Sequence, residues 1–155
     1  MAERTPNLLS LEQIKALIPH RAPFLLVDKI LDFERKEWIR GYKKIDPQDA
    51  VFQGHFPGRP IYPGVLIVEA MAQTGGCLLM QEIADPKNQV IFFMSLDAIK
   101  FRKPVNPGDE LIMEVKSLSF KSRTSKMRGE AFVNGVKVAE AEFVSILQNI
   151  QGVSS

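Results

Sequence analysis

The segment from about Gly64 to Ala84 places the tightest constraint on the fold, because it has helical length and apolar residues on every side. A helix without a polar face is normally buried. The segment stops at Asp85-Pro86, since proline cannot continue a helix. The sequence therefore predicts one long central helix that the rest of the chain must cover.

Segments on both sides of this helix have the β-branched and aromatic content of strands. The last two are joined by Asn134-Gly135, the strongest short hairpin signal. A short helix over residues 10–17, opened by a capping-box pattern of Ser10 and Gln13, precedes the first strand. The expected strands cover residues 24–31, 37–45, 90–101, 110–120, 125–133 and 136–147.

Many strands in long antiparallel runs, together with one apolar helix, predict an α+β layer structure in which a sheet of about five to seven strands curves around the helix. In the segment 125–133, small or apolar residues alternate with mostly charged ones, which is typical of an antiparallel strand with one solvated face. A length of 155 residues, of which 45% are hydrophobic, predicts a single domain over residues 1–155.

The composition argues against several protein classes. The N-terminus lacks the apolar core of a signal peptide, and Glu69, Gln73 and a glycine pair interrupt the longest apolar stretch, so we expect a cytoplasmic protein that does not span a membrane. The single cysteine, Cys77, cannot form an internal disulfide and is expected to be a buried, inert thiol. Two histidines and one cysteine do not supply a zinc site, so we expect no metal.

His55 and Glu69, fourteen residues apart, are the candidate catalytic residues. His55 lies in a loop that three prolines stiffen, and Glu69 lies in the apolar helix with no basic residue one turn away. Gln73 is the polar helical neighbour that could hold Glu69 by a hydrogen bond. Two titratable groups in contrasting environments indicate acid/base chemistry without a cofactor. The alternative is that Glu69 makes a buried structural hydrogen bond.

Pro63-Gly64 stands where the helix is expected to begin. Glycine lets a ligand approach the free backbone amides there, and the positive end of the helix dipole could polarise a carbonyl oxygen. The alternative is that the prolines and glycines of this loop only direct an exposed chain.

The stretch from His55 to Gln73, HFPGRPIYPGVLIVEAMAQ, resembles the signature of the (3R)-hydroxyacyl-acyl-carrier-protein dehydratases of bacterial-type fatty-acid synthesis. Residues 19–28, PHRAPFLLVD, and 100–109, KFRKPVNPGD, resemble two further segments of that family in the expected order. Tyr62 departs from the family, in which methionine is common at this place. The sister family of dehydratase-isomerases has aspartate in the place of Glu69, so the resemblance implies dehydration without isomerisation.

The resemblance implies a hot-dog fold and a homodimer, often assembled further into a trimer of dimers, in which the histidine of one subunit meets the glutamate of the other. The loop 54–63 is long enough, because nine extended residues reach up to about 30 Å. An apolar acyl tunnel at the dimer interface would be the matching feature, although core packing is an equal alternative for its candidate lining residues. These candidates are Phe92, Phe93 and Met94.

Gly75 and Gly76 inside the central helix cost roughly 1 kcal/mol each relative to alanine. Such glycines are expected where a neighbouring strand, a second subunit or an acyl chain approaches the helix closely. The sequence leaves these three alternatives open.

The implied reaction removes water from a (3R)-3-hydroxyacyl thioester on acyl carrier protein and gives the trans-2-enoyl thioester. In this hypothesis neutral His55 takes the C2 proton, the Gly64 amide holds the thioester oxygen, and protonated Glu69 helps the C3 hydroxyl to leave. Tyr62 and Gln73 are candidates for supporting this pair. Whether Glu69 donates the proton or orients the substrate stays open. A hot-dog thioesterase and a non-catalytic acyl-thioester sensor are the competing functions.

Acyl carrier protein is acidic, so basic residues near a tunnel mouth would attract it. The chain has a net charge of +2 and two basic clusters, for which a solvated face is the alternative. The basic residues lack interleaved stacking aromatics, so we expect no nucleic-acid partner. The candidate contacts are Lys100, Arg102, Lys103, Lys121, Arg123, Lys126 and Arg128.

Overall fold

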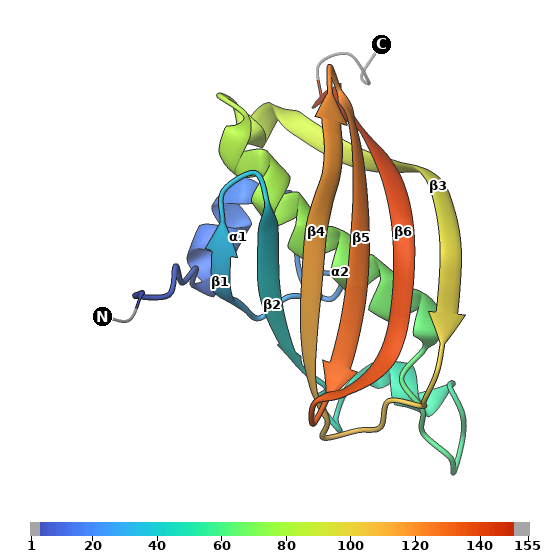
Figure 1. Ribbon diagram of the computed structural model, residues 1–155. Helices are drawn as coiled ribbons and strands as arrows, with labels where there is room; N and C mark the ends of the chain where they lie inside the picture. Colours follow the sequence, from blue (N-terminus) through green and yellow to red (C-terminus); the bar gives the residue numbers. More distant parts are fainter. Residues whose placement is uncertain (1–3, 151–155) are drawn as a thin grey trace.

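The computed structural model describes residues 4–150 and contains a six-stranded antiparallel sheet that curves around one long helix, α2 (Gly64–Leu79) (Figure 1). The strand order is β1-β2-β4-β5-β6-β3. This arrangement confirms the predicted α+β hot-dog fold. The strands are β1 (Lys29–Glu34), β2 (Trp38–Lys44), β3 (Gln89–Phe101), β4 (Glu110–Lys121), β5 (Thr124–Val133) and β6 (Val136–Asn149).

Local sequence signals set several boundaries. Helix α1 (Leu11–Leu17) begins after Ser10, whose hydroxyl accepts a hydrogen bond from the Gln13 amide while the Gln13 side chain accepts one from the Ser10 amide. The predicted capping box is therefore confirmed. Asn134 and Gly135 have φ angles of 51° and 77°, as a two-residue hairpin between β5 and β6 requires.

Two predicted boundaries are wrong. The first strand was expected over residues 24–31, but β1 starts at Lys29. In the preceding segment, the backbone at Phe24 and Leu26 forms hydrogen bonds with a side chain of α2 and not with a neighbouring strand. The Gln73 side chain accepts from the Leu26 amide and donates to the Phe24 carbonyl. The central helix was expected to reach Ala84, but α2 ends at Leu79 and continues as the 3₁₀ helix η2 (Met80–Glu82).

The helix lies very close to the sheet. A Cβ atom on Gly75 would lie 2.5 Å from the sulfur of Met127 on β5, and one on Gly76 would lie 3.1 Å from Ile91 on β3. Of the three alternatives for the glycine pair, the structure therefore supports close approach of neighbouring strands. The stretch Gly64–Glu82 is long and apolar enough to cross a membrane, but 67% of it is buried inside the protein, as in the core helix of a sheet.

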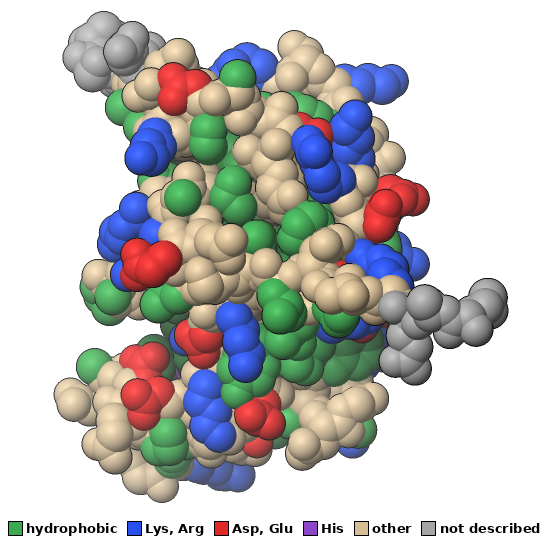
Figure 2. Space-filling model, turned by 90° about the vertical axis from the view of Figure 1, so that its left-hand side faces the viewer, with side chains coloured by type: hydrophobic (Ala, Val, Ile, Leu, Met, Phe, Trp, Pro, Cys, Tyr) green, Lys and Arg blue, Asp and Glu red, His purple; other side chains and the backbone are tan. Residues whose placement is uncertain are grey.

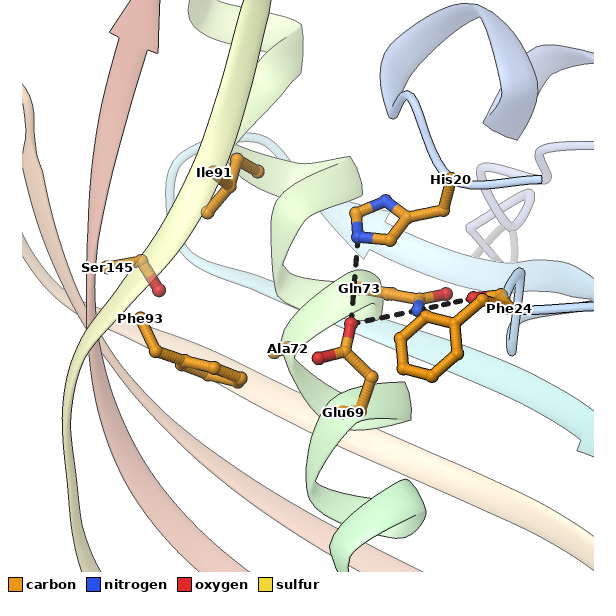
Figure 3. Close-up of a pocket in the computed structure, with 8 residues that line it drawn as sticks. All are labelled: His20, Phe24, Glu69, Ala72, Gln73, Ile91, Phe93 and Ser145. Atoms are coloured by element: carbon orange, nitrogen blue, oxygen red, sulfur yellow. Dashed lines mark hydrogen bonds and ion pairs between the residues drawn. The ribbon is translucent and has the colours of Figure 1, made fainter. Parts of the chain in front are cut away.

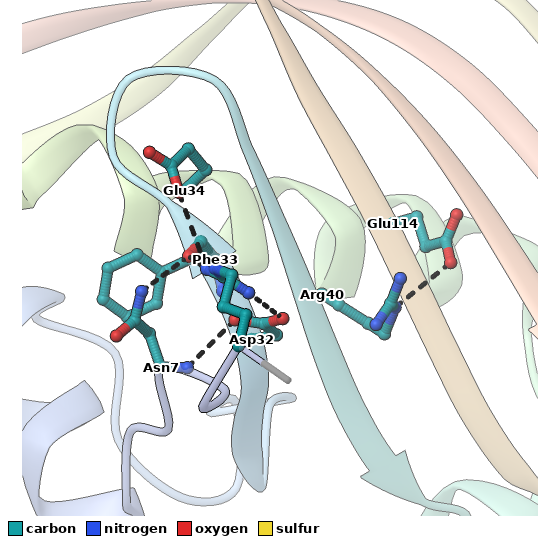
Figure 4. A network of polar contacts seen from close by, with 7 residues as sticks. Asn7, Asp32, Phe33, Glu34, Arg40 and Glu114 are labelled. Carbon is teal, nitrogen blue, oxygen red and sulfur yellow. Dashed lines mark hydrogen bonds and ion pairs between the residues drawn. The ribbon is translucent and has the colours of Figure 1, made fainter. Parts of the chain in front are cut away.

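The two edges of the sheet differ. The β1 edge is covered by residues 4–9, in which Leu9 pairs with Ile30 and the Asn7 amide donates to Asp32 (Figure 4). On this side of the molecule basic and acidic side chains are interspersed with small hydrophobic areas (Figure 2). The β3 edge instead carries large apolar side chains that are 37 to 58% exposed. These are Phe92, Phe93, Met94, Leu96, Ile99 and Phe101.

Candidate active site

The imidazole of His55 is held in one tautomer by the loop that carries it. Its Nδ1 lies 2.7 Å from the carbonyl oxygen of Ile61, and the Ile61 amide donates back to the His55 carbonyl at 3.0 Å. A carbonyl oxygen can only accept, so Nδ1 must carry the hydrogen. In the neutral ring, Nε2 therefore has the lone pair that a general base requires.

His55 and Gly64 line the same cavity, of about 390 Å³, at the start of α2. Pro63 precedes the helix and provides no side-chain cap, and within residues 4–150 the Gly64 amide donates to no backbone or side-chain group. A free amide at a helix start can stabilise negative charge on an oxygen. The ring of Phe101 packs against Gly64 so closely that a Cβ atom there would lie 2.6 Å from it.

Glu69 lines a second, smaller cavity of about 140 Å³, which Figure 3 shows. Its side chain is 20% exposed and thus largely buried. The carboxyl faces the gap between α2 and the edge strand β3. Its cavity is lined by His20, Phe24, Glu69, Ala72, Gln73, Ile91, Phe93 and Ser145.

Gln73 fixes the orientation of Glu69, as its position one helical turn away predicted. Its Nε2 donates to Glu69 Oε2 at 2.9 Å and to the Phe24 carbonyl at 2.9 Å, while its Oε1 accepts from the Leu26 amide at 2.7 Å. Both amide hydrogens are used, so the orientation of the Gln73 side chain is determined. Glu69 Oε1 is left pointing toward the side of the cavity where Phe93 lies (Figure 3).

His20 is a site residue to which the sequence interpretation gave no role. Its Nε2 lies 3.6 Å from Glu69 Oε2, and its side chain is only 21% exposed. Burial lowers the pKa of His20, while the negative charge of Glu69 opposes that effect. The one available signal was the Pro19-His20-Arg21 segment, which supported the family resemblance without indicating a function.

His55 and Glu69 do not share a cavity within this chain, because the linings of the two cavities have no residue in common. Gly64 and Glu69 are five positions apart on α2, which places them about 140° apart around the helix axis. In one chain, His55 and the Gly64 amide therefore lie on one side of α2, and the Glu69 carboxyl lies on another.

The Tyr62 side chain lies in the core and not between the candidate catalytic groups. Its ring packs against Phe52 with centroids 6.2 Å apart, and within the described residues its buried hydroxyl has no hydrogen-bond partner. Burial raises the pKa of Tyr62 well above its ordinary value. Tyr62 lines the His55 cavity but not the Glu69 cavity, so its supporting role at His55 stays a prediction.

Only one of the three tunnel candidates lines the Glu69 cavity. Phe93 does so, and its ring makes an edge contact with Phe143 at 6.2 Å. Phe92 and Met94 are 45% and 58% exposed on the same edge strand and do not line this cavity. Ile91 of β3 and Ser145 of β6 line it instead.

Lys121 and Arg123 lie far along the sheet from the cluster of Lys100, Arg102 and Lys103, whereas Arg128 shares Glu140 with Arg102. On β6, Phe101 of β3 pairs with Ala139, whereas Thr124 of β5 pairs with Ile146, which is roughly 24 Å further along the strand. Arg102 and Lys103 line the His55 cavity. Lys121 and Arg123, at the turn between β4 and β5, are therefore distant from the His55 cavity.

Several of these basic side chains are already paired. Arg102 donates to Glu140 at 2.9 Å, Arg128 contacts Glu140 at 3.3 Å, and Arg123 donates to the Leu147 carbonyl at 2.8 Å. Within residues 4–150, Lys100 and Lys103 have exposed side chains without an ion pair. Lys103, which lines the His55 cavity, and Lys100, at the end of β3, are therefore free to contact a partner.

Similar proteins place the chain in a family. Curated relatives include the 3-hydroxyacyl-[acyl-carrier-protein] dehydratase FabZ of Campylobacter jejuni (strain RM1221), which is 49% identical over 143 residues, or 90% of this chain and 98% of the relative. The enzyme of the same description from Aliarcobacter butzleri (strain RM4018) is 49% identical over 144 residues, with the same shares covered.

Solved structures with the same fold are more distant in sequence. The dehydratase heterocomplex ApeI:P from Xenorhabdus doucetiae has a TM-score of 0.75 at 16% identity and covers 99% of this chain and 100% of that one. A hot-dog-like protein from Thermanaerovibrio acidaminovorans has a TM-score of 0.60 at 15% identity, over 78% of this chain and 87% of that one. The family model described as FabA-like domain matches residues 18–142, a range that includes His20, His55 and Glu69, so the chain belongs to the FabA-like domain family.

Proposed function

We propose that this protein is a cytoplasmic 3-hydroxyacyl-acyl-carrier-protein dehydratase, which removes water from the (3R)-3-hydroxyacyl thioester and forms the trans-2-enoyl thioester. The names of its curated relatives support this reaction. The observation that carries the proposal is the pair of half-sites on one chain: a histidine whose Nε2 is free to accept a proton, and a carboxyl whose Oε1 faces the side of its cavity where Phe93 lies.

The two half-sites become one active site in a homodimer. The open β3 edge supports this assembly, because an exposed row of large apolar side chains on an edge strand favours pairing with another strand. A second copy of the chain, joined at β3, would cover these side chains and the adjacent Glu69 cavity, which Phe93 and Ile91 line. His55 of one subunit would then meet Glu69 of the other. Assembly into a trimer of dimers stays a prediction.

In this site, His55 Nε2 takes the proton from C2 of the substrate. The electrons of the broken C–H bond form the C2–C3 double bond as the C3–O bond breaks, and Glu69 Oε1 gives its proton to the departing hydroxyl, which leaves as water. The thioester oxygen gains negative charge during this step, and the Gly64 amide stabilises it. Phe93, Ile91 and Phe24 provide the apolar surface for the acyl chain.

Acyl carrier protein would approach from the side of the His55 cavity, where Lys103 lines the cavity and is free, as is Lys100 at the end of β3, to attract its acidic surface. Lys121 and Arg123 are too far from this cavity to flank the same entrance. We therefore assign the carrier contact to the cluster that follows β3.

The test combines two inactive variants. His55→Ala and Glu69→Gln are each expected to lower turnover by roughly two to four orders of magnitude, measured from the absorbance of the enoyl thioester. When their subunits exchange, each mixed dimer gains one site with both native residues and one with neither, so activity should rise toward half the native value per mixed dimer. A tag on one variant measures the fraction of mixed dimers.

No recovery despite confirmed exchange would contradict the shared site. A thiol assay run on the same samples checks the competing function, because a thioesterase releases free thiol and a dehydratase does not. Thiol release without a change in enoyl absorbance would contradict the proposed reaction.

A further inference from the structure

We propose that His20 is a positioning residue that keeps the transferable proton of Glu69 on the oxygen facing the substrate. The inference rests on the proposed dehydratase function. It starts from two contacts of Glu69 Oε2: the amide of Gln73 at 2.9 Å and Nε2 of His20 at 3.6 Å. Both groups approach the same oxygen, and Oε1 is left toward the cavity (Figure 3).

The tautomer of His20 follows from its surroundings. Its Nδ1 is buried, and within the described residues it has no hydrogen-bond partner. A neutral imidazole carries one N–H, and a hydrogen on Nδ1 would be a buried donor without an acceptor. The hydrogen therefore belongs on Nε2, which faces Glu69 Oε2. This is the opposite tautomer to that of His55, whose hydrogen is on Nδ1.

The charges around His20 keep it neutral. Burial disfavours its charged form most strongly, Glu69 on α2 favours that form, and Arg21 on its own segment disfavours it. A neutral His20 can donate a hydrogen to Glu69 without forming an ion pair. The distance of 3.6 Å between Nε2 and Oε2 is longer than an ordinary hydrogen bond, so the Nε2–H acts on Oε2 as a weak, mainly electrostatic donor.

The backbone that carries His20 is held in place. The guanidinium of Arg21 donates to the carbonyl oxygens of His20 at 2.6 Å, Ile18 at 3.0 Å and Lys15 at 2.9 Å. The following residues are held by Gln73, through Phe24 and Leu26. The segment 20–26 therefore positions both donors of Glu69. It carries His20 itself, and its backbone at Phe24 and Leu26 fixes the side chain of Gln73.

Two donors on Oε2 have a chemical consequence. An oxygen that accepts a hydrogen bond from Gln73 and faces the Nε2–H of His20 is a poor place for a proton, so in a neutral carboxyl the proton belongs on Oε1. After Oε1 has given that proton to the departing hydroxyl, the same donors stabilise the carboxylate. His20 touches no reacting atom in this scheme, and its effect appears in the rate of the chemical step and not in substrate binding.

A kinetic test compares three proteins: the native enzyme, His20→Phe, which keeps a ring but has no donor, and His20→Gln, which keeps a donor. We expect His20→Phe to lower kcat roughly ten- to hundredfold with KM changed less than about threefold, as the loss of a hydrogen bond to a developing charge predicts. His20→Gln should recover most of kcat. Equal losses in both variants, or an unchanged kcat in His20→Phe, would overturn the proposal.

A spectroscopic test needs no variant activity. The chain has only two histidines, so a long-range ¹H–¹⁵N spectrum of histidine-labelled protein resolves both rings, and His20→Phe assigns them. We expect the Nε2–H tautomer for His20. An Nδ1–H tautomer would overturn the inference. Failure of the proposed function is distinguished separately, because a native enzyme without dehydratase activity would refute the reaction before any His20 variant is compared.

Discussion

Gly75 and Gly76 are adjacent on α2, and replacing each with alanine tests how tightly the helix packs on the sheet. A Cβ atom on Gly75 would lie 2.5 Å from Met127 Sδ and 3.2 Å from Val115 Cγ1. A Cβ atom on Gly76 would lie 3.1 Å from Ile91 Cδ1, the end of a flexible side chain that can turn away. The overlap is therefore severe only at Gly75.

The two substitutions share the same gain in helix preference, which is about 1 kcal/mol for alanine over glycine and cancels when the variants are compared. Overpacking a well-filled core typically costs about 1 to 3 kcal/mol, and this cost falls mainly on Gly75→Ala. At about 2 to 4 °C per kcal/mol for a chain of this length, Gly75→Ala should melt roughly 2 to 12 °C below Gly76→Ala.

Thermal unfolding followed by circular dichroism measures this difference. Both variants must be studied at one subunit concentration, because the melting temperature of an oligomer depends on concentration. Met127→Ala makes room for the new methyl group, so Gly75→Ala should cost less in that background. If Gly75→Ala melts at or above Gly76→Ala, or if Met127→Ala gives no relief, contact with β5 is not what requires glycine there.

Two further predictions concern charge. Lys103→Glu should reduce turnover of carrier-bound substrate more than turnover of a short thioester analogue, and the difference should shrink as the salt concentration rises. Lys121→Glu should leave the ratio of the two turnover rates unchanged. Equal effects of the two variants would contradict the assignment of the carrier contact. A hydrogen bond from Arg102 and the nearby positive charges lower the pKa of Glu140 from 4.5 to about 2. The ionised Glu140 therefore contributes to the free energy of unfolding above pH 4.5, and this contribution is lost as the pH falls toward 2. Glu140→Gln should flatten the fall in melting temperature over that range, and an unchanged slope would refute this reasoning.

The fold could be predicted because its strongest signals are local. The capping box at Ser10 and the hairpin at Asn134-Gly135 depend on neighbouring residues only, and both are confirmed. The first strand was misplaced for the opposite reason. The backbone of Phe24 and Leu26 is bound by a side chain more than forty residues away, and local strand preference contains no information about that contact.

The candidate site divides in the same way. Gln73 could be predicted as the partner of Glu69, because one helical turn separates them. His20 could not, since its contact with Glu69, 49 positions further along the chain, depends on how the chain returns to α2. The separation of the basic clusters likewise depends on strand register, which the sequence pattern did not give.

The two edges of the sheet determine how many copies of the chain can pair. A sheet with two open edges can add strands without limit, whereas one open edge permits a closed dimer with a two-fold axis. In the described part of the chain, Leu9 and Ile30 exchange two hydrogen bonds that cover the β1 edge, and the apolar β3 edge lies at the other end of the strand order. On the proposed dimer, the N-terminal segment thus contributes to catalysis indirectly, because it directs pairing to β3, where His55 of one subunit would meet Glu69 of the other.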